Sequence, residues 1–267
     1  MKKETRKPSV GDFPFPAYGK NLSSMLKSQL DMLRLKIKLW EDARFVLVDL
    51  PIDPNAANRI LPACMWLRKP YRATLFIADY AKTAFTVPYR EAALLLHVRT
   101  PFGSGVHCPW MIVDDDTAMI YGRELLGYPK KMGSFVFTEK GDTVKAGLAR
   151  RGFELISVKL KKLGRETNPA PVLGMKTFNM GGMGQYTAFN PIWLFRPREV
   201  IHESYAAGAE VEIRPSPFDP IGSLLDGFRN PLPARYARVD ILGSRSLLPV
   251  GLAGPRKYAA TYELRYR

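Results

Sequence analysis

The spacing of apolar residues changes once along the chain, near residue 42. Between residues 21 and 41, apolar residues such as Leu22, Met25 and Leu26 recur at intervals of three and four, with lysines between them. This pattern predicts an amphipathic helix that packs on its own domain or on a partner subunit. Residues 1–20 are rich in Lys, Pro and Gly. We therefore predict an N-terminal arm and helix over residues 1–42 and one folded domain over residues 43–267.

From Arg44 onwards, short runs of β-branched and aromatic residues predict strands. We expect strands at 45–50, 73–85, 91–99, 106–113, 134–139, 144–149, 154–161, 192–196, 198–205, 209–214 and 236–242. Short helices are expected at 54–61, opened by Asp53, and around 221–228. Glycine-containing turns at 140–142 and 150–152 join antiparallel neighbours. Many antiparallel strands and few helices favour a mainly β (α+β) fold, with the sheet closed into a barrel that hides its edges.

Composition narrows the classes of partner. The chain is 46% hydrophobic, enough for a sizeable core, and 40 basic against 25 acidic residues give a net charge of +15. This charge attracts phosphates, anionic lipid or anionic substrates, but the basic residues are dispersed and no nucleic-acid recognition motif accompanies them. We expect no nucleic-acid partner. Without a long apolar run or a signal-peptide pattern, we also expect no integral membrane segment.

The sequence gives little indication of a metal site or of a disulfide bond. Cys64 and Cys108 lie far apart and outside any Cys-x-x-Cys pattern, which fits a protein of the reducing cytoplasm. The three histidines have no metal-site spacing. The run Asp114-Asp115-Asp116 is interpreted as the N-terminal cap of a helix. We predict no metal site.

The stretch Tyr121–Gly133 carries the most chemical information. It reads Tyr-Gly-Arg-Glu-Leu-Leu-Gly-Tyr-Pro-Lys-Lys-Met-Gly. Pro129 fixes its own φ, so Lys130 and Lys131 are expected in a rigid, extended bend rather than in a helix. The cationic neighbour and the surrounding apolar residues disfavour a positive charge on Lys130 and favour a nucleophilic, neutral amine. Two adjacent lysines are nevertheless more often a solvated pair on a loop.

This stretch resembles the active-site segment of the acetoacetate decarboxylase family, in which a Gly-Arg-Glu triplet leads to an aromatic-Pro-Lys-Lys-hydrophobic-Gly run. The matching residues are Gly122, Arg123, Glu124, Tyr128, Pro129, Lys130, Lys131 and Gly133. The resemblance runs from about Arg44 to Gly251 and includes Pro-Tyr-x-Glu at 88–91 and the Pro-rich run at 217–233. It implies a conical antiparallel β-barrel with peripheral helices and the reactive lysine in its apolar interior.

The resemblance also implies roles for single residues. Lys130 would form a Schiff base with a keto acid, with Lys131 as the cationic neighbour that helps to activate it. Glu91, at the start of an apolar strand, would orient the substrate or handle a proton. No metal or organic cofactor is then needed, because the protonated imine itself stabilises the developing carbanion.

Two positions depart from the family pattern. Members that decarboxylate acetoacetate carry a second glutamate fifteen positions before Glu91, where this chain has Phe76. They also carry an arginine where this chain has Ala43, with Arg44 one residue later. We keep Arg44 as a supporting candidate, although a one-residue shift within a strand would point it to the wrong face.

These observations lead to one expected function and two alternatives. We expect a cofactor-independent lyase that decarboxylates a β-keto acid resembling acetoacetate through an iminium at Lys130. The expected ligand is this small keto-acid substrate, and the protein is expected to form a homo-oligomer. The first alternative is an aldolase-dehydratase or cyclase that acts on a larger keto acid through the same lysine. The second is a non-catalytic barrel that binds an anionic or lipid ligand.

Overall fold

The computed structural model describes residues 38–174, 176–182 and 190–267. Most of the helix predicted at 21–41 lies outside these residues. Its last four residues begin strand β1 (Lys38–Pro51) instead, so the prediction of a helix is wrong there. The reason is tertiary: Lys38 lies opposite Leu242 in the sheet, and its Nζ forms an ion pair with Asp240 at 2.8 Å. Strand pairing outweighs the local spacing of apolar residues.

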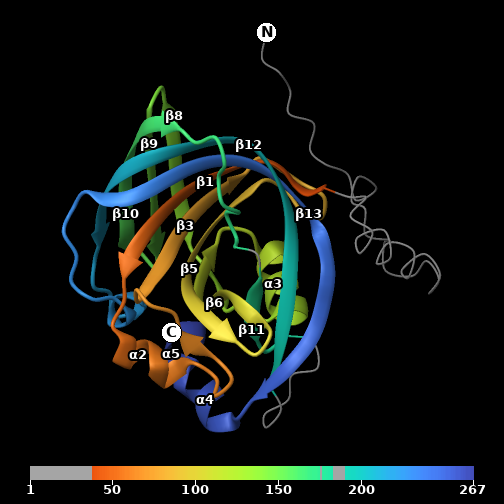
Figure 1. The fold of residues 1–267 in the computed structure, drawn as a ribbon. Helices are drawn as coiled ribbons and strands as arrows, with labels where there is room; N and C mark the ends of the chain where they lie inside the picture. The colour runs from red at the N-terminus through yellow and green to blue at the C-terminus, as the bar shows by residue number, and fades with distance from the viewer. Residues whose placement is uncertain (1–37, 175, 183–189) are drawn as a thin grey trace.

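The described strands form one sheet, and the prediction of a mainly β fold is confirmed (Figure 1). After β1 they are β2 (Trp66–Leu67), β3 (Arg72–Tyr80), β4 (Lys82–Thr83), β5 (Tyr89–Thr100), β6 (Gly103–Val113), β7 (Lys130–Met132), β8 (Ser134–Lys140), β9 (Thr143–Arg150), β10 (Phe153–Arg165), β11 (Thr177–Met180), β12 (Asn190–Ile213) and β13 (Leu232–Ala253). The order is β11-β6-β5-β3-β1-β13-β12-β10-β9-β8. An additional β11–β12 pairing closes part of this path into a ring.

The turns predicted between neighbouring strands are present. Hairpins join β8 to β9 and β9 to β10, and the turns contain Gly141 and Gly152 at φ values of 57° and 81°. The three strands predicted between 192 and 214 are a single strand, β12. Pro197, which cannot donate to the ladder, lies at irregular pairing steps between β12 and β13, so the strand continues past it.

Helices are short and few in the described part of the chain. They are α2 (Pro54–Ile60), α3 (Asp116–Leu126), α4 (Pro255–Ala260) and α5 (Tyr262–Tyr266), with a 3-10 turn, η2 (Ile221–Leu224). Asp53 caps α2, and Asp115 caps α3 by accepting a hydrogen bond from the Ala118 amide at 2.7 Å, as predicted. None of the helices described here has the length and apolar character needed to cross a bilayer.

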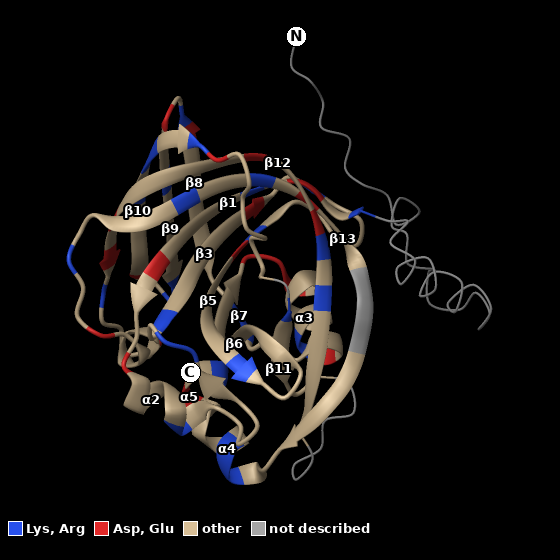
Figure 2. Ribbon diagram, in the orientation of Figure 1, with Lys and Arg blue, Asp and Glu red and all other residues tan. Residues whose placement is uncertain are grey.

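The strands β1, β3, β5 and β6 are buried on both faces. One face, here called the α3 face, carries Phe45, Phe76, Ala93 and Val113 and packs with Ala118 of α3. The other, called the β10 face, carries a larger apolar cluster shared with α2, β9 and β10. Lys and Arg are spread over many elements of the described chain rather than gathered on one (Figure 2). The position of a residue on one face or the other decides which side chains it meets.

Candidate active site

Lys130 is positioned by the end of α3 and the start of β7. The helix ends at Gly127, whose φ of 72° lets the chain turn, and its amide bonds back to the Gly122 carbonyl. β7 then pairs in parallel with β6, with Lys130 opposite Met111. The extended bend predicted after Pro129 is confirmed.

Lys130 and Glu91 form a buried ion pair on the α3 face. Lys130 Nζ donates to Glu91 Oε2 at 2.5 Å, and each residue is only 5% exposed. The Tyr80 hydroxyl donates to the second carboxylate oxygen, Oε1, at 3.5 Å. Burial, reinforced by the Glu91 charge, raises the pKa of Tyr80, which therefore remains a protonated donor at neutral pH. The structure thus brings together the two residues predicted to be catalytic.

Aromatic rings surround this pair. Lys130 Nζ lies 5.7 Å from the centroid of the Tyr89 ring, which packs 4.8 Å from Tyr80. Phe45 extends the wall, with its ring centroid 5.7 Å from that of Tyr80. Cys108 is also buried on this face, and burial raises the pKa of its thiol, so it is not a thiolate nucleophile. Lys130 thus places a buried primary amine next to a carboxylate and an aromatic wall.

Two residues of the Gly-Arg-Glu triplet support the lysine directly. A Cβ atom on Gly122 would lie 2.6 Å from Lys130 Cδ, so any larger residue would displace the end of the lysine side chain. Arg123 Nη1 donates to the Lys130 carbonyl oxygen at 2.9 Å and holds the backbone of β7. These contacts give a physical reason for both residues at that spacing.

Lys131 points away from Lys130, to the β10 face, because successive residues of a strand alternate. Its Nζ donates to Asp219 Oδ2 at 2.7 Å, and Trp110 Nε1 donates to Asp219 Oδ1 at 2.8 Å. Burial lowers the pKa of Lys131 to about 8, although Asp219 acts in the opposite direction. The expected cationic neighbour of Lys130 is therefore engaged elsewhere. The sequence does not indicate Asp219 as the partner of Lys131, although Asp219 lies in the Pro-rich run at 217–233.

Arg44 is not brought to Lys130. It lies on the β10 face, where its guanidinium pairs with Asp79 and lies 3.6 Å from Glu139. Ala43 and Phe76, by contrast, are on the α3 face and are almost fully buried. The two departures from the family pattern thus place apolar side chains on the same face as the ion pair.

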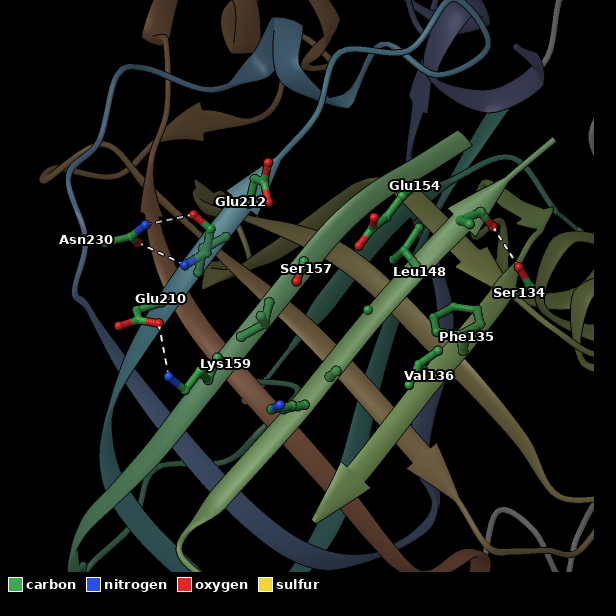
Figure 3. Close-up of a pocket in the computed structure, with 16 residues that line it drawn as sticks. Ser134, Phe135, Val136, Leu148, Glu154, Ser157, Lys159, Glu210, Glu212 and Asn230 are labelled. Carbon is green, nitrogen blue, oxygen red and sulfur yellow. Dashed lines mark hydrogen bonds and ion pairs between the residues drawn. The ribbon is translucent and has the colours of Figure 1, made fainter. Parts of the chain in front are cut away.

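A large cavity lies away from this pair. It has a volume of about 860 Å³ and is lined by β8, β9, β10 and β12, including Ser157, Lys159 and Glu210 (Figure 3). Of the two lysines that line it, Lys145 and Lys159, the second forms an ion pair with Glu210 at 3.6 Å. Within the described ranges, no group of three or more His, Cys, Asp or Glu residues is arranged to hold a metal ion.

The described strands thus form a mainly β ring that holds a buried lysine–glutamate pair on one face of the sheet. The chain belongs to the acetoacetate decarboxylase family, whose model matches residues 23–242. The match begins within the predicted N-terminal part, earlier than the resemblance at Arg44. No curated protein matches the sequence.

Solved structures share the fold at low sequence identity. One described as a structural study of acetoacetate decarboxylase has a TM-score of 0.68 and 15% identity, and the match covers 79% of this chain and 88% of that one. Acetoacetate decarboxylase from Legionella pneumophila has a TM-score of 0.67 at 16% identity, covering 78% and 86%. The enduracididine biosynthesis enzyme MppR complexed with pyruvate has a TM-score of 0.67 at 15% identity, covering 79% and 89%.

Proposed function

We propose that this protein is a cofactor-independent lyase in which Lys130 forms an imine with a keto acid. The observation that carries the proposal is the buried contact of 2.5 Å between Lys130 Nζ and Glu91 Oε2. A carboxylate at this distance is placed to take a proton from the ammonium, which leaves the amine free to attack a carbonyl carbon. Family membership and the similarity to keto-acid enzymes support the same chemistry.

The leading reaction is the decarboxylation of a β-keto acid. The Lys130 amine adds to the keto carbon, water leaves, and a protonated imine remains. The bond to the carboxylate then breaks, carbon dioxide departs, and the electron pair moves into the imine to give an enamine. The proton that Glu91 took from the ammonium leaves in the water molecule formed with the imine, so Glu91 takes up one proton from the solvent and transfers it to the carbon. Water then hydrolyses the new protonated imine to release a ketone and the Lys130 ammonium. The aromatic wall keeps bulk water from the charged intermediate.

A second candidate reaction uses the same imine for an aldol addition and dehydration. It is favoured by Phe76 and Ala43, which put apolar groups where acetoacetate-decarboxylating members of the family carry charges. It is also favoured by MppR, whose structure has been described with the condensation product of pyruvate and imidazole 4-carboxaldehyde. Here a proton, rather than carbon dioxide, leaves the carbon next to the imine, and the enamine attacks an aldehyde.

Reductive trapping tests the proposal. Borohydride with pyruvate should add the mass of one reduced keto acid, and with acetoacetate the mass of the reduced keto acid or of the reduced ketone left after loss of carbon dioxide. Peptide mapping should locate the adduct at Lys130. Lys130→Arg should abolish the adduct, while Lys131→Arg, the matched control on the opposite face, should retain it. Carbon dioxide release then identifies a decarboxylase, and a product formed only when an aldehyde is added identifies an aldolase. If the folded wild-type protein forms no adduct with any keto acid, it is a binding protein and not an imine-forming enzyme.

A further inference from the structure

A second cavity lies on the α3 face, the face that carries Lys130 and Glu91. Its volume is about 520 Å³, and Asp49, Thr74, His97 and Arg235 are among its lining residues. These residues come from β1, β3, β5 and β13, which also form the wall beside the ion pair. The cavity therefore lies further along the same strands rather than on a separate part of the molecule.

Strand register gives the distance between the cavity and the ion pair. Three successive rows cross β5, β3 and β1 on the α3 face: Glu91–Ala78–Phe45, then Ala93–Phe76–Leu47, then Leu95–Thr74–Asp49. Rows on one face are two residues apart, so the Asp49 row lies about 13 Å from the Glu91 row. The row between them, which contains Phe76, is entirely apolar. The polar groups of the cavity, Asp49, Thr74 and His97, are thus separated from the reactive pair by one apolar row, of which Leu47 also lines the cavity.

Hydrogen bonds in the cavity leave acceptors free. Thr74 Oγ1 lies 3.1 Å from Asp49 Oδ1 and 2.9 Å from His97 Nε2. The hydroxyl has one proton, which goes to the carboxylate, so His97 Nε2 must be the donor in the second bond. Burial lowers the pKa of His97 and outweighs the opposing effect of Asp49, which favours a neutral ring. The other ring nitrogen, Nδ1, is then an acceptor.

Two arginines, Arg68 and Arg235, are among the residues that line the cavity, and Arg68 is exposed. Arg235 donates its two terminal nitrogens to the carbonyl oxygens of Ala170 and Pro171. Asp49 has no ion-pair partner within the described part of the chain, and its Oδ2 atom accepts no hydrogen bond from those residues. Asp49 Oδ2 and His97 Nδ1 are therefore two acceptors of this cavity that remain available to a ligand. Such a pair suits a ligand that donates hydrogen bonds, above all an ammonium group.

We infer that this cavity binds the far end of the substrate, and that the substrate is an elongated keto acid carrying an amino group. Its keto carbon lies at Lys130, its aliphatic segment crosses the apolar row at Phe76, and its ammonium group lies at Asp49 and His97. This inference rests on the proposed function and adds the substrate class to it. Short keto acids reach only the lysine and gain nothing from the cavity.

Three keto acids of matched chemistry test the inference by borohydride trapping at Lys130. They are pyruvate, α-oxononanoate and ω-amino-α-oxooctanoate, the last two having the same chain length but a methyl or an amino end. The wild-type protein should reach half-maximal trapping with the amino-ended acid at roughly tenfold lower concentration than with the methyl-ended acid, as expected for a hydrogen bond to a charged group. In Asp49→Asn this tenfold preference should be lost.

The control is Asp142→Asn, which removes an exposed carboxylate in the β8–β9 hairpin and should keep the preference. Trapping of pyruvate without any preference for the amino-ended acid would overturn the inference and leave the imine chemistry standing. Equal preference in wild type and Asp49→Asn would also overturn it. Failure of the wild-type protein to trap any of the three acids would overturn the proposed function itself, and the inference with it.

Discussion

Replacing both Lys130 and Glu91 is expected to destabilise the protein less than replacing either one. Both side chains are 6% exposed and are joined at 2.5 Å. Lys130→Met alone leaves a buried carboxylate without its cation, and Glu91→Gln alone leaves a buried ammonium without its anion. Each change should lower the free energy of unfolding by about 3 to 5 kcal/mol. If the two losses were independent, they would add to about 6 kcal/mol or more.

The double variant removes both charges and leaves no unpaired ion. Its free energy of unfolding should fall within about 2 kcal/mol of the wild-type value, because uncharged replacements of a buried pair are often nearly neutral. Urea unfolding of the four proteins, followed by tryptophan fluorescence, measures these values. A control cycle with Lys159→Met and Glu210→Gln, an exposed pair, should show almost no coupling. Losses that simply add in the Lys130–Glu91 cycle would show that the two groups do not form a buried pair in solution.

The remaining predictions concern positioning, charge and the N-terminus. Gly122→Ala should slow trapping at Lys130 at least about tenfold by displacing the lysine stem, although alanine favours a helix; Gly227→Ala, which meets nothing within 4 Å, should not change the rate. Lys131→Met should still form the borohydride adduct at Lys130. Its free energy of unfolding should depend on pH differently from that of the wild type, because the variant lacks the Lys131 charge. The folded protein holds the Lys131 pKa at about 8, against 10.5 for the free side chain, so the unfolded chain binds more protons between these values. The wild type should gain on the order of 3 kcal/mol as pH rises through that window, and Lys131→Met should lack this gain. Deleting residues 1–22, which precede the family match, should preserve trapping, whereas deleting 1–41 removes Trp40, whose indole donates to the Tyr89 hydroxyl at 2.8 Å, and should weaken it. Full activity in the longer deletion would contradict that role for Trp40.

Sequence patterns in this chain predict hairpins between neighbouring strands. They are less informative about strands whose pairing partners lie far away in the sequence. The hairpins around Gly141 and Gly152 follow from short turns between neighbouring apolar runs. The start of β1 does not, because residues 38–41 continue a helical spacing and their partners in β13 lie some 200 residues later. The closure of the ring through β11 and β12 also depends on pairing that no short stretch of sequence records.

The site divides in the same way. Lys130 and Glu91 are found from motifs, but only the register between β5, β6 and β7 shows that they meet. The face to which Lys131 points can be predicted only once β7 is known to be a strand whose two faces are both covered. Asp219 can be recognised as the partner of Lys131 only from the fold. Arg44 is next to the position predicted for a supporting arginine, but the alternation of the strand turns it to the opposite face.

The two adjacent lysines look interchangeable in the sequence and occupy separate chemical compartments in the molecule. The first amine lies beside Tyr89 and Glu91 on one face of the sheet, and the second lies beside Asp219 on the other face. Lys131 therefore cannot serve as a spare nucleophile when Lys130 is lost. A one-residue deletion just before β7 would bring the second lysine to Glu91 and set a methionine against Asp219, so the spacing of this segment is as important as its composition.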